Sequence, residues 1–316
     1  MDMIYAWVMA FILVGFVLAE DKSVKRGSNV AHHNIIHTTW CKPDDGDNLN
    51  PKTLTAFRAI LRTQNNVRFI VWTSPECMSK TEKQLNELKS FCTKALIEVR
   101  STSELHEASK LETGSVKQCT SALESVDREG MKVMSPLIRF VALYFYGGIF
   151  IANDVLVLKA LAYFQGKSFA YRSNTEVNYY NTDVMGLKKG SPLLPKIIDR
   201  RGGCVPPSFA PEDINKALDC PNGICDELIM FPTHLFDPVM VQPGSFEKRD
   251  WQFEPPTRSG DPYSWFFTKD KTSNLDSFFP GSYTFHWHEG KENVDINGGS
   301  YFAEFQHLNA KCQLHA

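Results

Sequence analysis

The segment from residue 135 to residue 158 limits the possible folds of this chain more than any other part of it. Residues 135–146 have the apolar spacing of a buried helix. Ser135 is a favourable N-cap, and Pro136 suits the first helical position, where no backbone N–H is needed. The pair Gly147-Gly148 has the backbone freedom with which many helices end. The sequence therefore predicts a helix that begins at Ser135 and ends at this glycine pair.

A buried strand and a carboxylate follow this helix. The apolar run Ile149–Ile151 predicts a short strand, the polar pair Asn153-Asp154 interrupts the run, and residues 155–158 are apolar again. In open α/β sheets, ligands bind beyond the carboxyl ends of the strands. We therefore expect Asp154 to lie at the end of a strand that faces a ligand site.

Strand-like and helix-like segments alternate along much of the chain. Strands are predicted at residues 34–37, 67–72, 96–99, 168–171 and 184–186, and helices at residues 54–61 and 80–96. This alternation is typical of an α/β fold. From residue 202 onward Pro, Gly and Cys are dense, so loops and short strands are expected there.

Length, charge and composition exclude several classes of protein. The 316 residues allow either two domains or one large α/β domain. With 34 Lys and Arg against 36 Asp and Glu, the net charge of −2 argues against a nucleic-acid partner held by bulk charge. A hydrophobic fraction of 43% with 22% charged residues is typical of a folded globular chain, which excludes disorder and a multi-span membrane protein.

The N-terminal segment predicts entry into the secretory pathway. An apolar run at residues 4–19 is short for a membrane span and ends in the small residues of a signal-peptide cleavage site. A cleaved signal peptide over residues 1–19 is favoured, and a short membrane anchor of the Golgi type is the alternative. The even number of 8 Cys then indicates disulfides of open connectivity, with a local bridge between Cys220 and Cys225 as one possibility.

The helix, the glycine pair, the strand and the carboxylate together resemble a known family. Residues 143–159 read Leu-Tyr-Phe-Tyr-Gly-Gly-Ile-Phe-Ile-Ala-Asn-Asp-Val-Leu-Val-Leu-Lys. This is similar to the Tyr-Gly-Gly-Ile-Tyr and Asp-x-Asp pattern of DXD-type glycosyltransferases. It most resembles the α-1,4-glycosyltransferase and initiating α-1,6-mannosyltransferase group, which is glycosyltransferase family 32. Residues 34–40, 181–192, 231–238 and 282–288 resemble further motifs of that family in the same order.

The resemblance implies a GT-A fold, in which one α/β domain contains a Rossmann-like, mostly parallel sheet. It spans residues 32–290, so residues 20–316 are expected to form a single domain after the leader. It also implies transfer of a hexose from a UDP- or GDP-sugar donor to a glycan or glycolipid acceptor. Retention of anomeric configuration and dependence on Mn²⁺ or Mg²⁺ are implied as well. The expected location is the lumen of the Golgi or ER, or outside the cell.

Two positions depart from the family pattern. Ala152 stands where the first Asp of the Asp-x-Asp motif is expected, and Pro136 stands where an acid usually follows the capping Ser. The resemblance implies that both positions contact the sugar nucleotide. The alternative function is therefore a catalytically impaired, glycosyltransferase-like secreted binding protein, that is, a pseudoenzyme.

The matching residues define an expected donor and metal site. The resemblance assigns Asp154 to the metal and the donor, with Asn153 beside it, and assigns Arg139 to the donor. One Asp is enough for Mg²⁺ or Mn²⁺ when phosphate oxygens complete the coordination. His286 or His288 would add a ligand that suits Mn²⁺ better than Mg²⁺. The alternatives are a surface ion pair for Arg139 and a pair of His residues without a ligand role.

Four further residues are candidates for the same site. Lys291 is expected to meet the phosphates as a point charge. Trp40 is expected to stack on the nucleobase or the ribose, and a place in the core is its alternative. Asn181 and Asp183 both match one family position near the reacting sugar, so each stays open as the catalytic candidate.

Overall fold

The structure, a computed structural model, describes residues 34–41, 48–110, 112, 114–173, 180–201, 214, 228–238, 281–287 and 300–312. Residues from His33 onward form one compact unit. The predicted leader at residues 1–19 lies outside the described residues. Within the described ranges, no helix has both the length and the apolar character that a membrane span needs.

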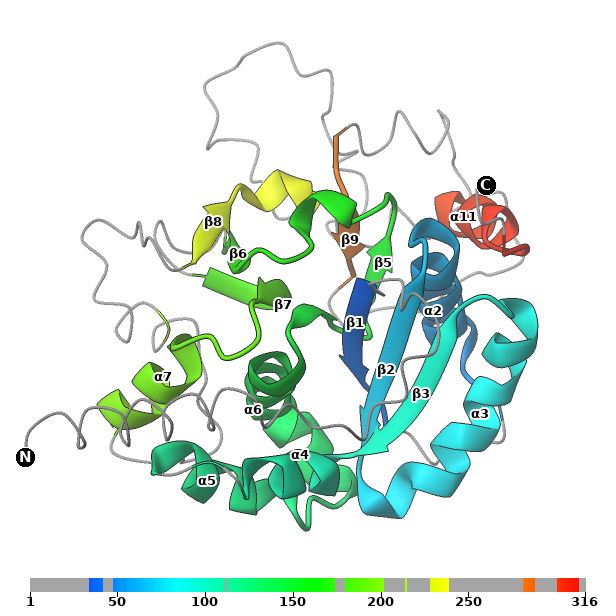
Figure 1. Ribbon diagram of the computed structural model, residues 1–316. Coiled ribbons are helices and arrows are strands. Elements are labelled where there is room, and N and C mark those ends of the chain that lie inside the picture. The colour runs from blue at the N-terminus through cyan, green and yellow to red at the C-terminus, as the bar shows by residue number, and fades with distance from the viewer. Residues whose placement is uncertain are drawn as a thin grey trace, which may run out of the picture. The chain divides into compact units, whose positions relative to one another are not determined.

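A seven-stranded sheet forms the centre of the fold (Figure 1). Its strands are β1 (Asn34–Thr39), β2 (Val67–Thr73), β3 (Leu96–Ser101), β4 (Gly148–Ile151), β6 (Phe169–Arg172), β7 (Tyr180–Leu187) and β8 (Ile229–Phe231). They lie in the order β3, β2, β1, β4, β7, β6, β8. Strands β3, β2, β1 and β4 are parallel, β7 is antiparallel to β4 and β6, and β8 is parallel to β6. The expected α/β fold with a mostly parallel sheet is confirmed.

Two short strands form a second, antiparallel sheet. They are β5 (Val155–Val157) and β9 (Thr284–His286), and Val155 pairs with His286. The pairing extends beyond β5, because Trp287 N–H donates to the Asp154 carbonyl at 3.1 Å. This small sheet therefore fixes His286 beside the turn that follows β4.

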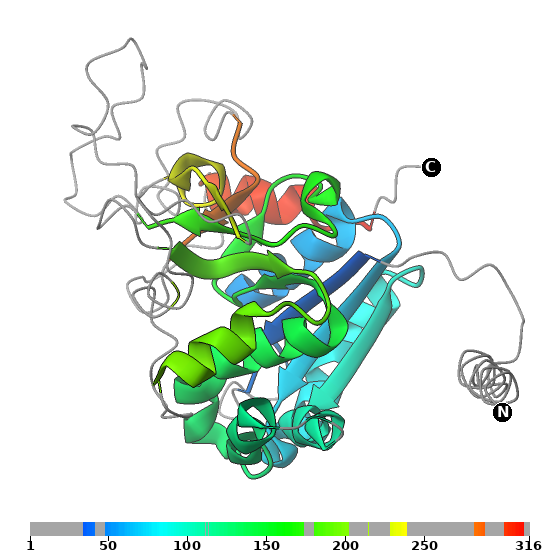
Figure 2. The same ribbon diagram turned by 60° about the vertical axis from the view of Figure 1, so that its left-hand side comes forward.

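Helices cover both faces of the central sheet (Figures 1 and 2). They are α2 (Pro51–Thr63), α3 (Met78–Phe91), α4 (Thr102–Ser109), α5 (Ser115–Thr120), α6 (Arg128–Tyr146), α7 (Leu193–Arg201) and α11 (Tyr301–Leu308). Short 3₁₀ turns are η1 (Pro75–Cys77), η2 (Ser121–Leu123), η3 (Ala162–Phe164) and η5 (Thr233–Leu235). The helices predicted at residues 54–61 and 80–96 are α2 and α3, but α3 ends at Phe91 and Leu96 already belongs to β3. Helices α4, α5, α7 and α11 were not predicted from the sequence, and α11 corrects the expectation that only loops and short strands follow residue 202.

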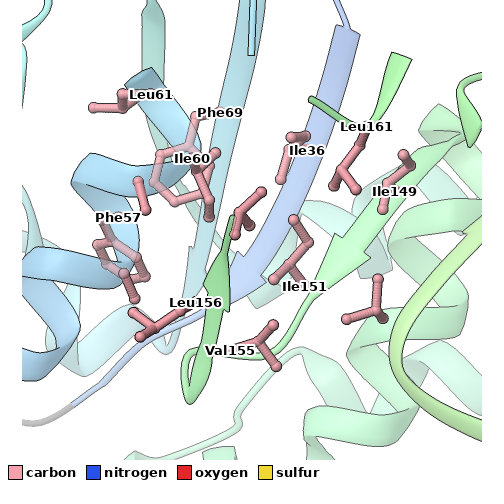
Figure 3. Packing of buried hydrophobic residues seen from close by; sticks show 14 of the residues in the cluster. Ile36, Phe57, Ile60, Leu61, Phe69, Ile149, Ile151, Val155, Leu156 and Leu161 are labelled. Carbon is pink, nitrogen blue, oxygen red and sulfur yellow. The ribbon is translucent and has the colours of Figure 1, made fainter. Parts of the chain in front are cut away.

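Alternating side chains of the strands build two separate cores. In β4, Ile149 and Ile151 belong to the cluster that packs against α2, α3 and α11, and Phe150 belongs to the cluster under α4, α5, α6 and α7. Figure 3 shows the first cluster, with Phe57 and Ile60 of α2 facing the sheet. Because successive strand residues point to opposite faces, a strand buried on both faces must be apolar throughout. This explains the continuous apolar run that predicted β4.

The structure corrects the predicted start of the long helix. Helix α6 begins at Arg128, where the Asp127 side chain accepts a hydrogen bond from Gly130 N–H, and Pro136 lies inside the helix. The signals at Ser135 and Pro136 were misleading because packing of the buried apolar face outweighs the cost of a proline inside the helix, which is about 3 kcal/mol. The Ser135 hydroxyl lies 3.0 Å from the Thr39 hydroxyl.

The glycine pair ends α6 as predicted, and each of the two positions requires glycine for a separate reason. Gly147 follows α6 with a φ of 69°, and Gly148 begins β4 with a φ of 97°. A Cβ at Gly148 would lie 2.5 Å from the Ile35 carbonyl oxygen in β1. Gly148 therefore lets β4 pack directly against β1 while the chain turns in a left-handed conformation.

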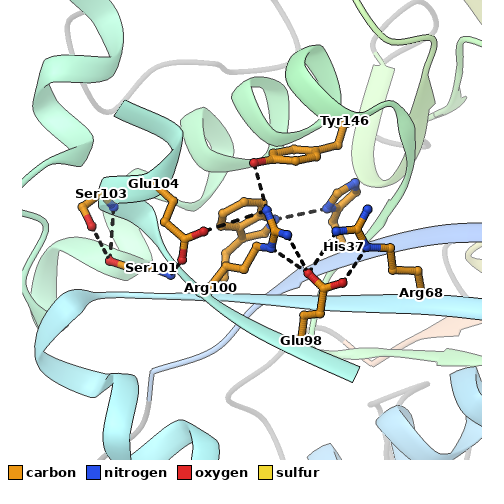
Figure 4. A network of polar contacts seen from close by, with 9 residues as sticks. His37, Arg68, Glu98, Arg100, Ser101, Ser103, Glu104 and Tyr146 are labelled. Atoms are coloured by element: carbon orange, nitrogen blue, oxygen red, sulfur yellow. Dashed lines mark hydrogen bonds and ion pairs between the residues drawn. The ribbon is translucent and has the colours of Figure 1, made fainter. Parts of the chain in front are cut away.

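A neutral histidine joins this turn to the sheet. His37 in β1 is fully buried; its Nε2 donates to the Gly147 carbonyl at 2.9 Å, and its Nδ1 accepts from the Trp72 indole at 3.1 Å. Burial lowers the pKa of His37 to about 4 against the opposing effect of its bond to Gly147. Figure 4 shows His37 beside the ion pair of Arg68 with Glu98.

Two disulfides hold segments that are distant in sequence. One joins Cys41, after β1, to Cys77 in η1, and the other joins Cys92, after α3, to Cys312, beyond α11. The prediction that the cysteines form disulfides is confirmed for these four. The local bridge predicted between Cys220 and Cys225 lies outside the described residues.

Candidate functional site

The site lies where the strand order of the parallel part reverses. Strand β1 lies between β2 and β4, so the chain moves away from β1 in opposite directions on its two sides. Open α/β sheets bind ligands at the carboxyl ends of the strands at such a point. Trp40 follows β1 there, and the turn Asn153-Asp154 follows β4. The expected position of Asp154 at the carboxyl end of a strand is confirmed.

Asp154 and His286 meet at this end of the sheet. The Nε2 atom of His286 lies 3.0 Å from Asp154 Oδ2. The side chain of His286 is 5% exposed and that of Asp154 is 16% exposed. The pair is thus mostly enclosed, and Asp154 keeps the more accessible surface.

Two more carboxylates face the other nitrogen of this imidazole. Nδ1 of His286 lies 3.7 Å from Asp183 Oδ2 and 3.8 Å from Asp237 Oδ2. Burial alone would lower the pKa of His286, but the charges of Asp154, Asp183 and Asp237, with the hydrogen bond to Asp154, raise it to about 9. The imidazole is therefore protonated at neutral pH and balances part of the negative charge around it.

Arg139 holds Asp183 from the opposite side. Its Nη2 donates to Asp183 Oδ1 at 3.0 Å, its Nη1 donates to the Thr182 hydroxyl, and its guanidinium lies 4.6 Å from the centre of the Phe150 ring. The predicted helix start at Ser135 would place Arg139 in the first turn, but α6 begins at Arg128. Arg139 instead lies in the middle of α6, where it faces β4 and β7, and its side chain is 6% exposed.

The two catalytic candidates have different surroundings in β7. Asn181 Oδ1 accepts a hydrogen bond from Asp183 N–H at 2.8 Å, so its side chain supports the local backbone. Asp183 directs its carboxylate to Arg139 and His286, and its carbonyl accepts from Ala152 N–H at 2.8 Å. Asp183 is therefore the candidate that joins the cluster, and it does so next to Ala152, the position at which the resemblance leads one to expect an Asp.

Trp40 is a core residue in this structure. It is 1% exposed, its Nε1 donates to Gln84 Oε1 at 2.9 Å, and its ring packs edge-on against Phe57. The predicted stacking of Trp40 on a nucleobase does not fit this position, because a ring enclosed on both faces has no surface for a ligand. The core alternative fits instead.

The remaining predicted site residues are only partly visible. Asn153 lies in the turn beside Asp154 and is half-buried. His288 and Lys291 lie outside the described residues, so their predicted roles stay predictions. Among the described residues, no group of three or more His, Cys, Asp or Glu side chains has the arrangement of a metal site.

Asp154 and His286 still form a pair that fits an open metal site. Their facing atoms are 3.0 Å apart. Two ligands at about 2.1 Å from one ion and at right angles to each other are about 3 Å apart. The described residues thus supply two adjacent ligands, and a cation bound there would need phosphate or water oxygens for its other positions.

Sequence reasoning missed two members of the cluster. Asp237 is 1% exposed and follows η5, and Tyr171 in β6 is fully buried. Burial raises the pKa of Tyr171 well above its usual range, and the charges of Asp183, Asp237 and Asp154 add to this effect. The signal for Asp237 was an acid inside the aromatic segment 231–238, since a carboxylate among apolar residues needs a partner.

Comparison with known proteins gives the following likenesses. No protein-family model matches the chain, and no curated protein matches it. Among solved structures, the chain is similar to the apo form of the glycosyltransferase GlyE of Streptococcus pneumoniae TIGR4, with a TM-score of 0.47 and 9% identity over 88% of this chain and 60% of that one. It is also similar to an active-site mutant of LgtC, with a TM-score of 0.43 and 10% identity over 87% and 95% of the two chains.

The PaToxG glycosyltransferase is a third such structure. Its TM-score is 0.43 and its identity 16%, over 59% of this chain and 68% of that one. This chain spans about three fifths of the length of GlyE.

Proposed function

We propose that this chain is a GT-A glycosyltransferase of the family 32 type. It transfers a hexose from a UDP- or GDP-sugar to a glycan or glycolipid acceptor, with retention of anomeric configuration. It acts in the Golgi or ER lumen or after secretion. The observation that carries the proposal is the convergence of Asp154, His286, Asp183 and Arg139 at the reversal point of a mostly parallel sheet.

The residues of the cluster suit the two charges that develop in glycosyl transfer. As the bond from the anomeric carbon to the diphosphate breaks, positive charge grows on the sugar and negative charge grows on the leaving group. Asp183, oriented by Arg139, is a carboxylate that stabilises the sugar side. The acceptor hydroxyl oxygen forms the new bond to that carbon, and its proton passes to the departing diphosphate.

Asp154 and His286 belong to the leaving-group side. Their facing atoms are 3.0 Å apart, so the two side chains would hold Mn²⁺. Mg²⁺ would fit this pair less well, because it prefers oxygen ligands to an imidazole nitrogen. A bound cation of this kind would neutralise charge on the diphosphate. His286 would have to give up its proton on binding the cation, because a ligating imidazole is neutral.

The alternative function, a pseudoenzyme that binds without turnover, is supported by the two departures from the family pattern, Ala152 and Pro136. Ala152 contributes no carboxylate at the turn after β4, and its N–H is used by the Asp183 carbonyl. Asp183 places a negative charge next to this position, which favours the enzyme over the pseudoenzyme. Binding without hydrolysis of any donor would support the pseudoenzyme.

Hydrolysis and binding of a donor panel test both functions. The full chain is assayed with UDP- and GDP-sugars and Mn²⁺, and Asp154→Ala is compared with Asp199→Asn, a substitution of an exposed acid on α7. We expect donor hydrolysis that Asp154→Ala reduces about 100-fold and Asp199→Asn leaves unchanged. Equal rates in wild type and Asp154→Ala would contradict the assignment of Asp154. Calorimetry identifies binding without turnover, and a gain of activity in Ala152→Asp would show that the defect is local.

A further inference from the structure

Asp237 is a buried acid that has no role in the proposed reaction. Only 1% of the residue is exposed, and its N–H donates to the Thr233 carbonyl at 2.8 Å, which closes the η5 turn. Phe236 and Tyr171, whose rings stack with centroids 5.5 Å apart, lie next to it. A carboxylate enclosed by aromatic rings is stable only near opposite charge.

The position of Asp237 is set by bonds between two segments that run side by side. Ser282 Oγ donates to the His234 carbonyl at 2.6 Å, Tyr283 N–H donates to the Leu235 carbonyl at 2.7 Å, and Thr284 Oγ1 donates to the Phe236 carbonyl at 2.6 Å. Each bond is one residue further along both segments, at a constant separation of 48 residues. The next step of this alignment brings Asp237 beside Phe285 in β9, the residue before His286.

The imidazole of His286 consequently lies between carboxylates on its two edges. Nε2 faces Asp154 at 3.0 Å, and Nδ1 faces Asp237 at 3.8 Å and Asp183 at 3.7 Å. Asp183 is 29% exposed on its side chain, whereas Asp237 is 2% exposed. Asp237 is therefore the fixed acid behind the ring, and Asp183 is the acid that a ligand can reach.

Tyr171 brings a buried hydroxyl to the neighbourhood of the same carboxylates. Its hydroxyl is fully buried and has no hydrogen-bond partner among the described residues. The charges of Asp183, Asp237 and Asp154 add to the effect of burial in raising the pKa of Tyr171, and that of Arg139 lowers it, so Tyr171 lies close to the same cluster. A phenol at this place is a donor available to a carboxylate of the cluster.

We propose that Asp237 is a positioning residue of the site, which orients the His286 imidazole so that Nε2 is directed at Asp154. Buried carboxylates often act in this way behind a functional histidine, because a charge on one ring nitrogen fixes the direction of the other. Asp237 then acts through His286 and touches neither the donor nor the acceptor. This role can be tested without the proposed function, and only the test that measures activity rests on that function.

The first test observes the ring of His286 and needs no substrate. The full chain is labelled with ¹⁵N-histidine, and the ring signals are assigned with His286→Gln. Asp237→Asn is compared with Asp199→Asn, the exposed control on α7. We expect the His286 ring nitrogens to shift in Asp237→Asn and to stay unchanged in the control. Unchanged ring signals in folded Asp237→Asn would overturn the proposal.

The second test uses donor turnover and separates positioning from binding. In Asp237→Asn we expect kcat to fall about 10- to 100-fold with a donor KM close to that of wild type, and Asp237→Glu to recover part of the loss. A kcat equal to that of wild type would overturn the proposal. If Asp237→Asn does not fold, Asp237→Ala, which also removes the carboxylate, takes its place in both tests, and ring signals and kcat unchanged from wild type would overturn the role. If the wild-type chain turns over no donor, the proposed function fails, and the ring signals still test the positioning role of Asp237.

Discussion

Nε2 of His286 lies 3.0 Å from Oδ2 of Asp154, although the two residues are 132 positions apart in the chain. The contact exists because β9 pairs with β5 in a small antiparallel sheet, and Val155 pairs with His286. It joins the carboxyl end of β4 to a segment close to the C-terminal part of the chain. The turn after β4 thus obtains a cationic partner that its own sequence neighbourhood does not contain.

This contact predicts a coupling between the two side chains. Asp154→Asn and His286→Gln should each lower the free energy of unfolding by about 2 kcal/mol, because each removes a charged hydrogen bond that is mostly enclosed. The double variant should lose at least about 1 kcal/mol less than the sum, since the second substitution has no intact pair to break. Urea unfolding of the metal-free chain measures all four states. Strict additivity would show that the two groups do not interact.

His37 predicts a loss of stability in mild acid. Its pKa falls from 6.5 in the unfolded chain to about 4 in the folded one, which corresponds to about 3 kcal/mol. Because the folded pKa is the lower one, this stability is fully present above pH 6.5 and is lost as the pH falls from 6.5 to 4. His37→Gln should flatten the profile in this window, and the exposed control His307→Gln should not. Urea unfolding at several pH values gives the profile, and an unaltered slope in His37→Gln would refute the assignment.

Gly148 predicts a steric limit at the start of β4. Gly148→Ala should destabilise the fold by about 3 kcal/mol, because its φ of 97° is unfavourable for alanine and the new Cβ would lie 2.5 Å from the Ile35 carbonyl oxygen. The matched control is Gly166→Ala, which has a φ of 70° and no atom within 4 Å of the new Cβ. It should cost only about 1 kcal/mol. Similar losses in both variants, measured by thermal unfolding, would mean that the approach of β4 to β1 is not tight.

Arg139 predicts that lysine cannot replace arginine at its position. The guanidinium contacts Thr182 and Asp183 with two different nitrogens and stacks over Phe150, which a lysine ammonium cannot reproduce. Arg139→Lys should lower the free energy of unfolding by about 2 kcal/mol. Arg128→Lys at the start of α6, where the side chain is 39% exposed, should change it by less than about 0.5 kcal/mol. Chemical unfolding compares the two. An unchanged free energy of unfolding in Arg139→Lys would show that Asp183 does not depend on the arrangement of the guanidinium nitrogens.

The local pattern was sufficient for most of the elements around the site. The apolar run of β4, the glycine pair and the polar turn with Asp154 all lie where the sequence placed them, because strand burial and left-handed turns leave strong local signals. The predicted start of α6 was wrong, because a serine that suits the N-cap position also occurs inside helices, and the local sequence does not distinguish the two cases. The cap that operates belongs to Asp127, and the buried face of α6 outweighs the proline.

The sequence by itself determined the α/β alternation, the place of Asp154 after a buried strand and the chemical character of the residues around it. Only the tertiary structure decided which of those residues meet. It placed Trp40 in the core and turned Arg139 toward Asp183. It brought Asp183 and the unforeseen Asp237 close to His286, with Tyr171 near their charges. The physical reason is that spacing along a chain fixes which face of its own element a side chain occupies. The partner across that face comes from strand pairing and packing between segments far apart in sequence.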